Sequence, residues 1–481
     1  MNRWKKKIAI LLTVAMTAGV MAACGSSNET PAQPAAESTP QAAATTAGEE
    51  NQENKGSDGL YELDFYAWSN PDNIKPLIEN FNSDYAGKYN LVYQKLADAM
   101  TLTINTALAS GEKIDVMTQA SHTDLRQRAD DGVYMGLKQF FDKEGWDYAE
   151  KLGTAIEETQ NINGDYYSIP YCNNINMVFF NKNMFDEAGL EYPQSGWTWE
   201  DFRETAIKLT SGSGADKVYG AMIDTAGSSG SDNYWDLIAR QKLGNNAYYN
   251  DDFTASTFGS DEMRESLQFF VDMTFKDQCI VPVEEITALQ YNSDPVGMAG
   301  LYNGKYAMWI APVYGCLYLK SSYGEIPEGT DIGMVDMPTP DGGQTITTCY
   351  SSTASIPANV ENPEAAWELL KYICIDRPDL FAGPKAMHPA VEFDNEEDER
   401  AFNEIIFKEK PGLDYDMAMD TMMNDRTLVS KDCTIKQGYV AIQEGMENIM
   451  SLVFSGEMGV EEALNELQKS VDAAITADLA K

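Results

Sequence analysis

Histidine is nearly absent from this chain, which has only His122 and His388 among its 481 residues. Catalytic triads that use histidine and multi-histidine metal sites therefore have little to draw on. The sequence also lacks a GxSxG nucleophile elbow and a phosphate-binding loop of the form GxxxxGKS or GxxxxGKT. We therefore expect no metal and no cofactor. A glycosidase with two catalytic carboxylates stays open, because 75 acidic residues are present and no pair stands out.

Basic residues are also scarce. The chain has 35 Lys and Arg against 75 Asp and Glu, a formal net charge of −40. Such a surface repels phosphate backbones, so nucleic acid is excluded as a natural partner. Beyond the N-terminal region, no uninterrupted apolar run reaches the roughly 20 residues that span a bilayer.

Paired cysteines are missing as well. The seven cysteines include no CxxC motif and no spacing typical of a metal site. We interpret the six that follow Cys24 as free buried thiols rather than a disulfide framework, although sequence alone cannot decide their state. They are Cys172, Cys279, Cys316, Cys349, Cys374 and Cys433.

What is present begins at the N-terminus. Four basic side chains fall within residues 3–7, residues 8–23 carry no charge, and Cys24 follows two alanines. This pattern is typical of a secretory signal, with residues 1–23 removed. Cys24 resembles the cysteine of a bacterial lipobox, which implies that it carries a lipid. A signal without lipid and a membrane anchor are the alternatives.

Residues 24–59 are rich in Ala, Ser, Thr, Pro, Gln and Glu and nearly devoid of large apolar side chains. Such a segment cannot bury enough surface to offset its ordering entropy, so we expect a disordered tether. Its end-to-end distance as a flexible coil would be about 30 Å.

From residue 60 onward, segments with alternating apolar residues are followed by segments with helical spacing. Strands are predicted at 60–68, 91–93, 114–117 and 176–181, and helices begin near Pro71, at Thr198 and at Asn362. Thr198 is a good N-cap, and Asp201 three residues later comes close to a capping box. Asn163-Gly164 predicts a tight turn. Strands that alternate with helices indicate parallel βαβ units, and the length suggests more than one domain.

Aromatic and amide side chains follow several of the predicted strands, where open α/β sheets bind ligands. Sugars need this mixture, because their C–H faces stack on aromatic rings and their hydroxyls need fixed donors and acceptors. We assign Trp197, Trp199 and Trp367 to packing instead. The candidate ligand-binding residues are Trp68, Asn70, Asp72, Gln119, Ser121, His122, Tyr171, Asn173, Asn174, Asp232, Trp235, Trp309, Tyr314 and Tyr350.

Five motifs, in this order, resemble those of one family. They are GDYYSIPY at 164–171, FFNKNMFDEAGL at 179–190, GWTWEDF at 196–202, GKYAMW at 304–309 and NPEAAW at 362–367. Together they span most of the chain beyond the tether. The family is that of the extracellular solute-binding proteins of ABC importers, which includes maltose-binding protein.

The resemblance implies a two-lobed α/β fold with a hinge, each lobe a mostly parallel sheet flanked by helices. We expect residues 60–170 with 312–376 in one lobe and 171–311 with 377–481 in the other. Crossings are expected near 169–176, 308–312 and 375–380. The resemblance also implies a monomeric receptor without enzymatic activity, held by its lipid on the outer face of the cytoplasmic membrane of a Gram-positive bacterium. It would deliver a carbohydrate to a membrane permease.

The sequence departs from the family pattern at one place. Ala311-Pro312-Val313-Tyr314 replaces a segment that ends in a stacking tryptophan, so Trp309 competes with Tyr314 for that role. Two other functions stay open. One is a surface carbohydrate-active enzyme such as a glycoside hydrolase, and the other is a glycan-adhesion lipoprotein without transport.

Overall fold

The computed structural model describes residues 59–96, 100–119, 122–153, 157, 160–225, 234–320, 324–342, 345–430 and 436–480. Cys24, the tether and Cys433 lie outside this part of the chain, so the predictions for them stay predictions. The described residues form one compact unit. Within them, no helix combines the length and the apolar character needed to cross a membrane.

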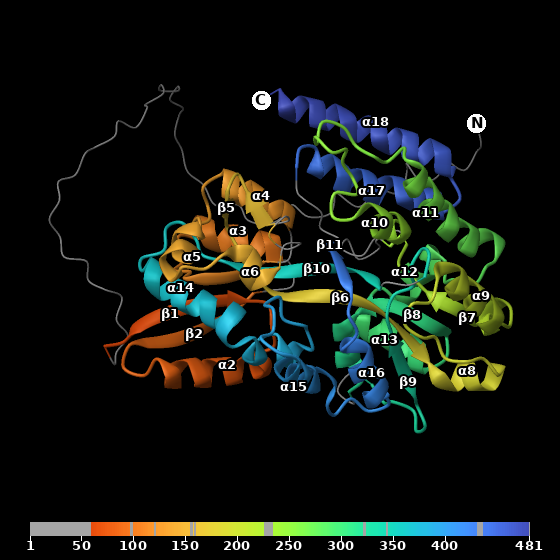
Figure 1. The fold of residues 1–481 in the computed structure, drawn as a ribbon, viewed down its shortest axis with the longest axis horizontal. Helices are drawn as coiled ribbons and strands as arrows, with labels where there is room; N and C mark the ends of the chain where they lie inside the picture. Colours follow the sequence, from red (N-terminus) through yellow and green to blue (C-terminus); the bar gives the residue numbers. More distant parts are fainter. Residues whose placement is uncertain are drawn as a thin grey trace, which may run out of the picture. The chain divides into compact units, whose positions relative to one another are not determined.

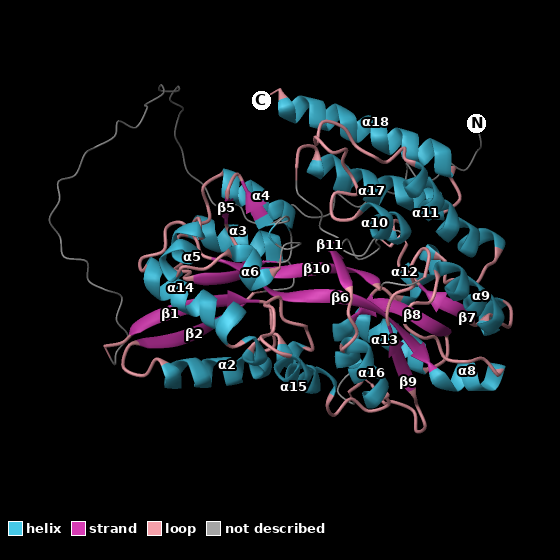
Figure 2. Ribbon diagram, viewed as in Figure 1, coloured by secondary structure: helices cyan, strands magenta, loops and turns pink. Residues whose placement is uncertain are grey.

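A mixed sheet runs through the middle of this unit, with helices packed against it (Figures 1 and 2). Its strands follow the order β2-β1-β3-β10-β6-β8-β7, with β11 paired to β10 and β9 paired to β6. Their bounds are β1 (Tyr61–Ala67), β2 (Tyr89–Lys95), β3 (Val116–Gln119), β6 (Ile169–Asn181), β7 (Tyr219–Met222), β8 (Tyr306–Pro312), β9 (Ile332–Val335), β10 (Ile346–Ser355) and β11 (Thr427–Ser430).

The predicted α/β class is confirmed. β1 pairs in parallel with β2 and β3, β7 with β8, and β10 with β11. The antiparallel pairs of this sheet all involve β6 or β10. A separate hairpin of β4 (Asn161–Ile162) and β5 (Asp165–Tyr166) turns at Asn163-Gly164, where both residues have positive φ. That turn confirms the one predicted from the dipeptide.

The helices that accompany β1, β2 and β3 come from the first third of the chain and from one later segment. The helix between β1 and β2 begins with Pro71, as predicted, and the Asn70 side chain caps it. These helices are α2 (Pro71–Asp84), α3 (Met100–Ser110), α4 (His122–Asp130), α5 (Lys138–Glu144), α6 (Tyr148–Leu152) and α14 (Pro363–Lys371).

The helices around β7 and β8 come from the middle and the end of the chain. The Thr198 and Asp201 side chains form the reciprocal capping box expected at the start of α9. The helices are α8 (Lys182–Ala188), α9 (Trp199–Leu209), α10 (Leu237–Leu243), α11 (Asp261–Val271), α12 (Val283–Leu289), α13 (Asp294–Tyr302), α15 (Glu396–Phe407), α16 (Tyr415–Met422), α17 (Tyr439–Phe454) and α18 (Val460–Leu479).

The buried apolar side chains form three clusters. One extends from β1 through β6 to α16, a second joins β7 and β8 to α9, α11, α17 and α18, and a small third one lies under α3 and α4. Trp197, Trp199 and Trp367 are 8%, 3% and 3% exposed, which confirms their assignment to packing. The five described cysteines after Cys24 are free and buried, as expected.

Two long strands, β6 and β10, connect the β1–β3 end of the sheet with the strands β7, β8 and β9. Residues 169–175 of β6 pair with β10, and residues 176–181 of the same strand pair with β8 and β9. β10 in turn pairs with β3 at its C-terminal end and with β11 at its N-terminal end. We call β6 and β10 the crossing strands. The candidate functional site lies on them.

Candidate functional site

One face of the crossing strands is polar. Asn174 lies opposite Tyr350 in the β6–β10 register, and the side chains of neighbouring strand residues alternate between the two faces. The residues that share this face form a set that we call the crossing face: Asn174, Asn176, Thr348, Tyr350 and Ser352.

Hydrogen bonds fix most of the crossing face. The Asn174 Nδ2 donates to Ser352 Oγ at 3.2 Å, and the Asn176 Nδ2 donates to Thr348 Oγ1 at 2.8 Å. The hydroxyl of Tyr234 donates to Asn176 Oδ1 at 3.1 Å. Partners of this kind hold each amide in one orientation. Asn174, Asn176 and Thr348 are 2%, 0% and 1% exposed, so in this form of the protein the partly exposed member of the face is Tyr350.

Two tyrosine rings border this polar strip. Tyr314, in the 3-10 turn η3 (Val313–Tyr318) after β8, and Tyr350 on β10 have hydroxyl oxygens 3.1 Å apart. Both residues are partly exposed, whereas Trp309 is 4% exposed and packs near Phe179. Tyr314 is therefore the better placed of the two residues that compete for the stacking role.

Trp68 is the most accessible aromatic candidate. It follows β1 and is 50% exposed. The next residue, Ser69, is held by Tyr93, whose hydroxyl donates to the Ser69 carbonyl at 2.7 Å and accepts from the Ser69 N–H at 3.2 Å. Asn70 and Asp72 are exposed at the start of α2, where the Asn70 side chain accepts from the Asp72 N–H. This loop has a fixed backbone and an open indole.

Three candidates have no ring or amide face open to a ligand in this structure. Trp235 is fully buried, and its Nε1 has no hydrogen-bond partner within the part of the chain that the structure describes. Tyr171 is 5% exposed and packs edge-on against Phe381, with ring centroids 4.8 Å apart. Burial raises the pKa of Tyr171 well above its ordinary value. The rings of Trp235, Trp309 and Tyr171 are enclosed by the core in this structure, and their predicted stacking on a ligand stays a prediction.

The remaining candidates divide by position. Asn173 precedes Asn174 in the strand, so its side chain points to the opposite face of β6. There its Oδ1 accepts from Ser351 Oγ at 2.8 Å. Gln119 ends β3 opposite Thr353 of β10, and His122 begins α4. Ser121 and Asp232 lie outside the described residues. The structure thus brings Asn174, Tyr314 and Tyr350 together.

Sequence reasoning missed three residues of the crossing face, Asn176, Thr348 and Ser352. Alternation from Asn174 points to Asn176, but only the register with β10 shows which face the pair occupies. The hydroxyl of Tyr234 reaches this face, whereas its predicted neighbour Trp235 does not.

A buried ion pair positions the segment that carries Tyr234. The Arg240 Nε lies 2.7 Å from Asp236 Oδ2, and the Tyr248 hydroxyl donates to the same oxygen at 2.6 Å. Side-chain exposure is 2% for Arg240 and 1% for Asp236. Such an enclosed pair constrains its surroundings, because either charge alone would be costly to leave in the core.

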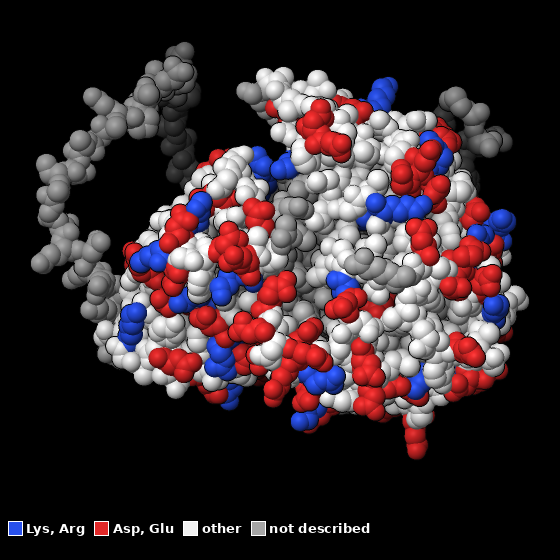
Figure 3. All heavy atoms as spheres, in the orientation of Figure 1, with Lys and Arg blue, Asp and Glu red and all other residues white. Residues whose placement is uncertain are grey.

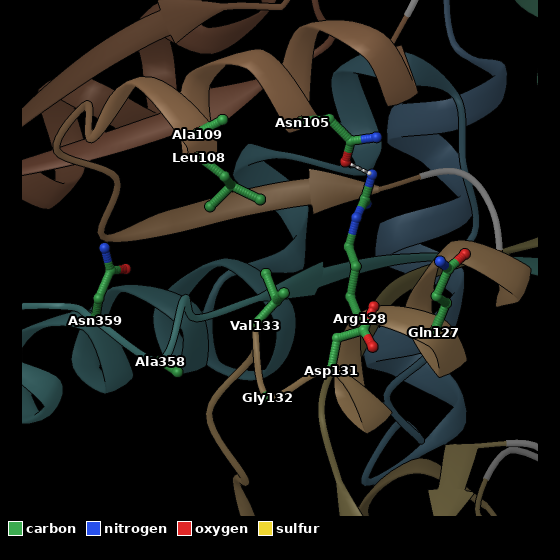
Figure 4. A pocket seen from close by; sticks show the side chains of 10 residues that line it. All are labelled: Asn105, Leu108, Ala109, Gln127, Arg128, Asp131, Gly132, Val133, Ala358 and Asn359. Carbon is green, nitrogen blue, oxygen red and sulfur yellow. Dashed lines mark hydrogen bonds between the residues drawn. The ribbon is translucent and has the colours of Figure 1, made fainter. Parts of the chain in front are cut away.

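The crossing face is distinct from a cavity of about 530 Å³ between α3, α4 and the segment after β10. Figure 4 shows its residues, among them Arg128, whose Nη2 donates to Asn105 Oδ1 at 2.9 Å. None of the predicted ligand-binding residues lines this cavity. We therefore centre the candidate site on the crossing face.

Curated relatives match only part of the chain. A multiple sugar-binding protein of Streptococcus mutans is 24% identical over 201 residues, which cover 42% of this chain and 40% of that protein. A mannitol-binding protein of Pseudomonas aeruginosa is 24% identical over 263 residues, covering 52% and 56%. The chain thus spans about half the length of these relatives.

Solved structures match more of the chain, and they establish its fold. An ABC substrate-binding protein from Listeria monocytogenes, in complex with cycloalternan, has a TM-score of 0.66 at 18% identity and covers 86% of this chain and 99% of its own. The sugar-binding protein MalE of Xanthomonas citri has a TM-score of 0.67 at 17% identity, with coverage of 87% and 98%. These proteins share the two-lobed architecture expected from the sequence motifs.

The strongest assignment comes from the sequence itself. The profile of the bacterial extracellular solute-binding proteins matches residues 67–373, which begin at the last residue of β1 and include both crossing strands and the tyrosines of the site. The chain therefore belongs to the family of bacterial extracellular solute-binding proteins.

Proposed function

We propose that this protein is the receptor of an ABC importer and that it captures a mono- or oligosaccharide between two lobes. The observation that carries the proposal is the crossing face, where fixed amides and hydroxyls lie beside the rings of Tyr314 and Tyr350. Sugars bind well to this combination, because hydroxyls need oriented partners and C–H faces favour aromatic rings. The names of the relatives, which are sugar- and mannitol-binding proteins, agree with it.

The proposed ligand-binding set follows from the structure and from the sequence candidates. Trp68, Asn70 and Asp72 would come from one lobe, and the crossing face would form the base of the cleft. Gln119, Ser121, His122 and Asp232 stay part of the proposal as predicted ligand contacts. The lobes themselves are proposed as 60–170 with 312–376 and 171–311 with 377–481.

The proposal extends to partners and location. The protein would act as a monomer outside the cytoplasm, held to the outer face of the membrane by lipid on Cys24, and pass its solute to a permease. It would perform no catalysis. Replacing Cys24 by Ser would release the protein from the membrane fraction or leave the precursor uncut, whereas unchanged membrane retention would contradict the anchor.

A ligand screen tests the central proposal. Thermal unfolding of the protein is measured with a panel of mono- and oligosaccharides, since a ligand at 100 times its Kd stabilises by about 2.7 kcal/mol. We expect saturable stabilisation by at least one sugar and full recovery of that sugar unchanged after incubation. Release of a shorter glycan would favour a glycoside hydrolase, and binding only to insoluble polymer would favour an adhesin.

A further inference from the structure

The loop that carries Trp68 is held by one side chain from the neighbouring strand. Trp68 directly follows β1, and the parallel register of β1 with β2 ends at Ala67 and Lys95. Figure 1 shows β1 and β2 side by side at one end of the sheet. Residues beyond Ala67 therefore lie outside the ladder of this pair, and a different contact has to fix their backbone.

That contact comes from the hydroxyl of Tyr93 on β2. Its proton lies between two carbonyl oxygens, because the hydroxyl oxygen is 2.8 Å from the Ala67 oxygen and 2.7 Å from the Ser69 oxygen. The same hydroxyl accepts the Ser69 N–H at 3.2 Å. A phenol hydroxyl can donate one proton and accept others, so this single group bonds the backbone on both sides of Trp68.

The indole of Trp68 has few contacts of its own. It is 50% exposed, and among the described residues it makes no ring contact and no side-chain hydrogen bond. Its position therefore depends on the backbone of the two residues that flank it. Both of these, Ala67 and Ser69, are bonded to Tyr93.

The ring of Tyr93 is itself anchored. It packs against the fully buried Phe65 of β1, with ring centroids 6.2 Å apart, and the residue is half-buried. Burial raises the pKa of Tyr93 above its ordinary value, so the hydroxyl keeps the proton that it donates at neutral pH. Because the ring is packed in place, its hydroxyl is a rigid point of attachment for the Trp68 loop.

We propose that Tyr93 is a positioning residue for carbohydrate binding, and that its hydroxyl holds the Trp68 indole in the stacking position before the solute arrives. The inference rests on the proposed function for the stacking role of Trp68. A ring on an ordered backbone loses less conformational entropy on binding, so it contributes more to affinity than a ring on a mobile loop. The sequence alone does not indicate Tyr93, because only the pairing of β1 with β2 places it beside this loop.

The test compares Tyr93→Phe with the matched control Tyr85→Phe in the full chain. Tyr93→Phe keeps the ring and removes the three contacts to the Trp68 loop. Tyr85 is also half-buried, but it packs near Tyr89 at the opposite end of β2, and its hydroxyl donates to Glu368 at 3.0 Å. Neither substitution changes the charge of a protein whose acidic side chains are spread over the face seen in Figure 3. Circular dichroism checks that each variant is folded.

The first measurement needs no sugar. The chain is labelled with 5-fluorotryptophan, and the fluorine resonance of Trp68 is assigned as the one that is lost in Trp68→Phe. In Tyr93→Phe this resonance should become narrower and shift toward that of free 5-fluorotryptophan, because the released indole moves more freely. The resonance of the buried Trp309 should stay in place, and Tyr85→Phe should change neither. An unchanged Trp68 resonance in Tyr93→Phe, or equal changes at Trp68 and Trp309, would overturn the proposal.

The second measurement is binding. Calorimetry uses the sugar of the screening panel that stabilises the chain most, and Tyr93→Phe should weaken its affinity about three- to tenfold. In a Trp68→Ala background the same substitution should cost less than about twofold, because Tyr93 acts through the indole. Equal losses in the two backgrounds would contradict the positioning role.

The two measurements separate this inference from the proposed function. Sugar binding with an unchanged Trp68 resonance in Tyr93→Phe contradicts the inference alone. Absence of binding by every panel sugar contradicts the proposed function, and the role of Tyr93 in carbohydrate binding falls with it, even where the Trp68 resonance responds.

Discussion

Lys385 is a buried cation whose replacement should stabilise the protein. It is 7% exposed, and its ammonium lies 3.5 Å from the ring centroid of Phe381 and 4.3 Å from that of Tyr171. Burial lowers its pKa from 10.5 to about 8, and the thiols of Cys172 and Cys374 oppose the shift.

The size of the effect follows from that shift. Between an ordinary value of 10.5 and a folded value of about 8, keeping the ammonium charged costs the native state about 3 kcal/mol at neutral pH. Cation–π contacts of the ammonium with two aromatic rings stabilise the charged native state by up to about 2 kcal/mol. Lys385→Met, which keeps the apolar stem and removes the charge, should therefore stabilise the protein by about 1–3 kcal/mol at pH 7.

The downward shift of the Lys385 pKa also predicts how stability depends on pH. Because the folded pKa is depressed, the unfolded chain binds more protons than the native state between about pH 8 and 10.5. Wild-type stability relative to Lys385→Met should therefore rise across that window. Urea unfolding at pH 7 and at pH 9.5 measures it, and taking the difference between the two proteins cancels the titration of other groups. Lys469→Met, on an exposed residue of α18, controls for net charge. A less stable Lys385→Met at pH 7, with no change in the difference at pH 9.5, would refute the reasoning.

Three other outcomes are expected. Asp236→Ala should lose about 3–5 kcal/mol in urea unfolding, because it leaves Arg240 buried and unpaired, whereas Asp236→Leu/Arg240→Met should be more stable than the single variant. Tyr234→Phe should lose about 1–3 kcal/mol, because the buried Asn176 oxygen loses its donor; an unchanged midpoint would contradict that bond. Saturating sugar should reduce the radius of gyration in solution scattering, since a ligand that contacts both lobes favours the closed form; no change at full occupancy would contradict closure.

Local patterns predicted local structure well. Thr198 and Asp201 indicated a capping box, Asn163-Gly164 indicated a turn, and Pro71 indicated a helix start, and the structure confirms all three. Each of these features depends on residues within four positions of one another, so the sequence carries the whole signal.

The pairing of the crossing strands could not be predicted in the same way. β6 and β10 are separated by more than 160 residues, and no local pattern shows that Asn174 faces Tyr350 while Asn173 faces Ser351 on the opposite side. A shift of one residue in this register would exchange the two faces. Trp235 illustrates the same limit, because its position beside a predicted helix start said nothing about the core that encloses it.

The most direct test of the account is the contribution of Tyr350 to carbohydrate binding. Calorimetry with the best sugar from the screen compares wild type, Tyr350→Ala and the control Tyr415→Ala, which removes a tyrosine that is 39% exposed on α16. Loss of a stacking ring at the crossing face should cost about 1–3 kcal/mol, or about 5- to 150-fold in Kd, while the control keeps the wild-type affinity. Unchanged affinity in Tyr350→Ala, or an equal loss in both variants, would contradict the assignment of the crossing face as the sugar site.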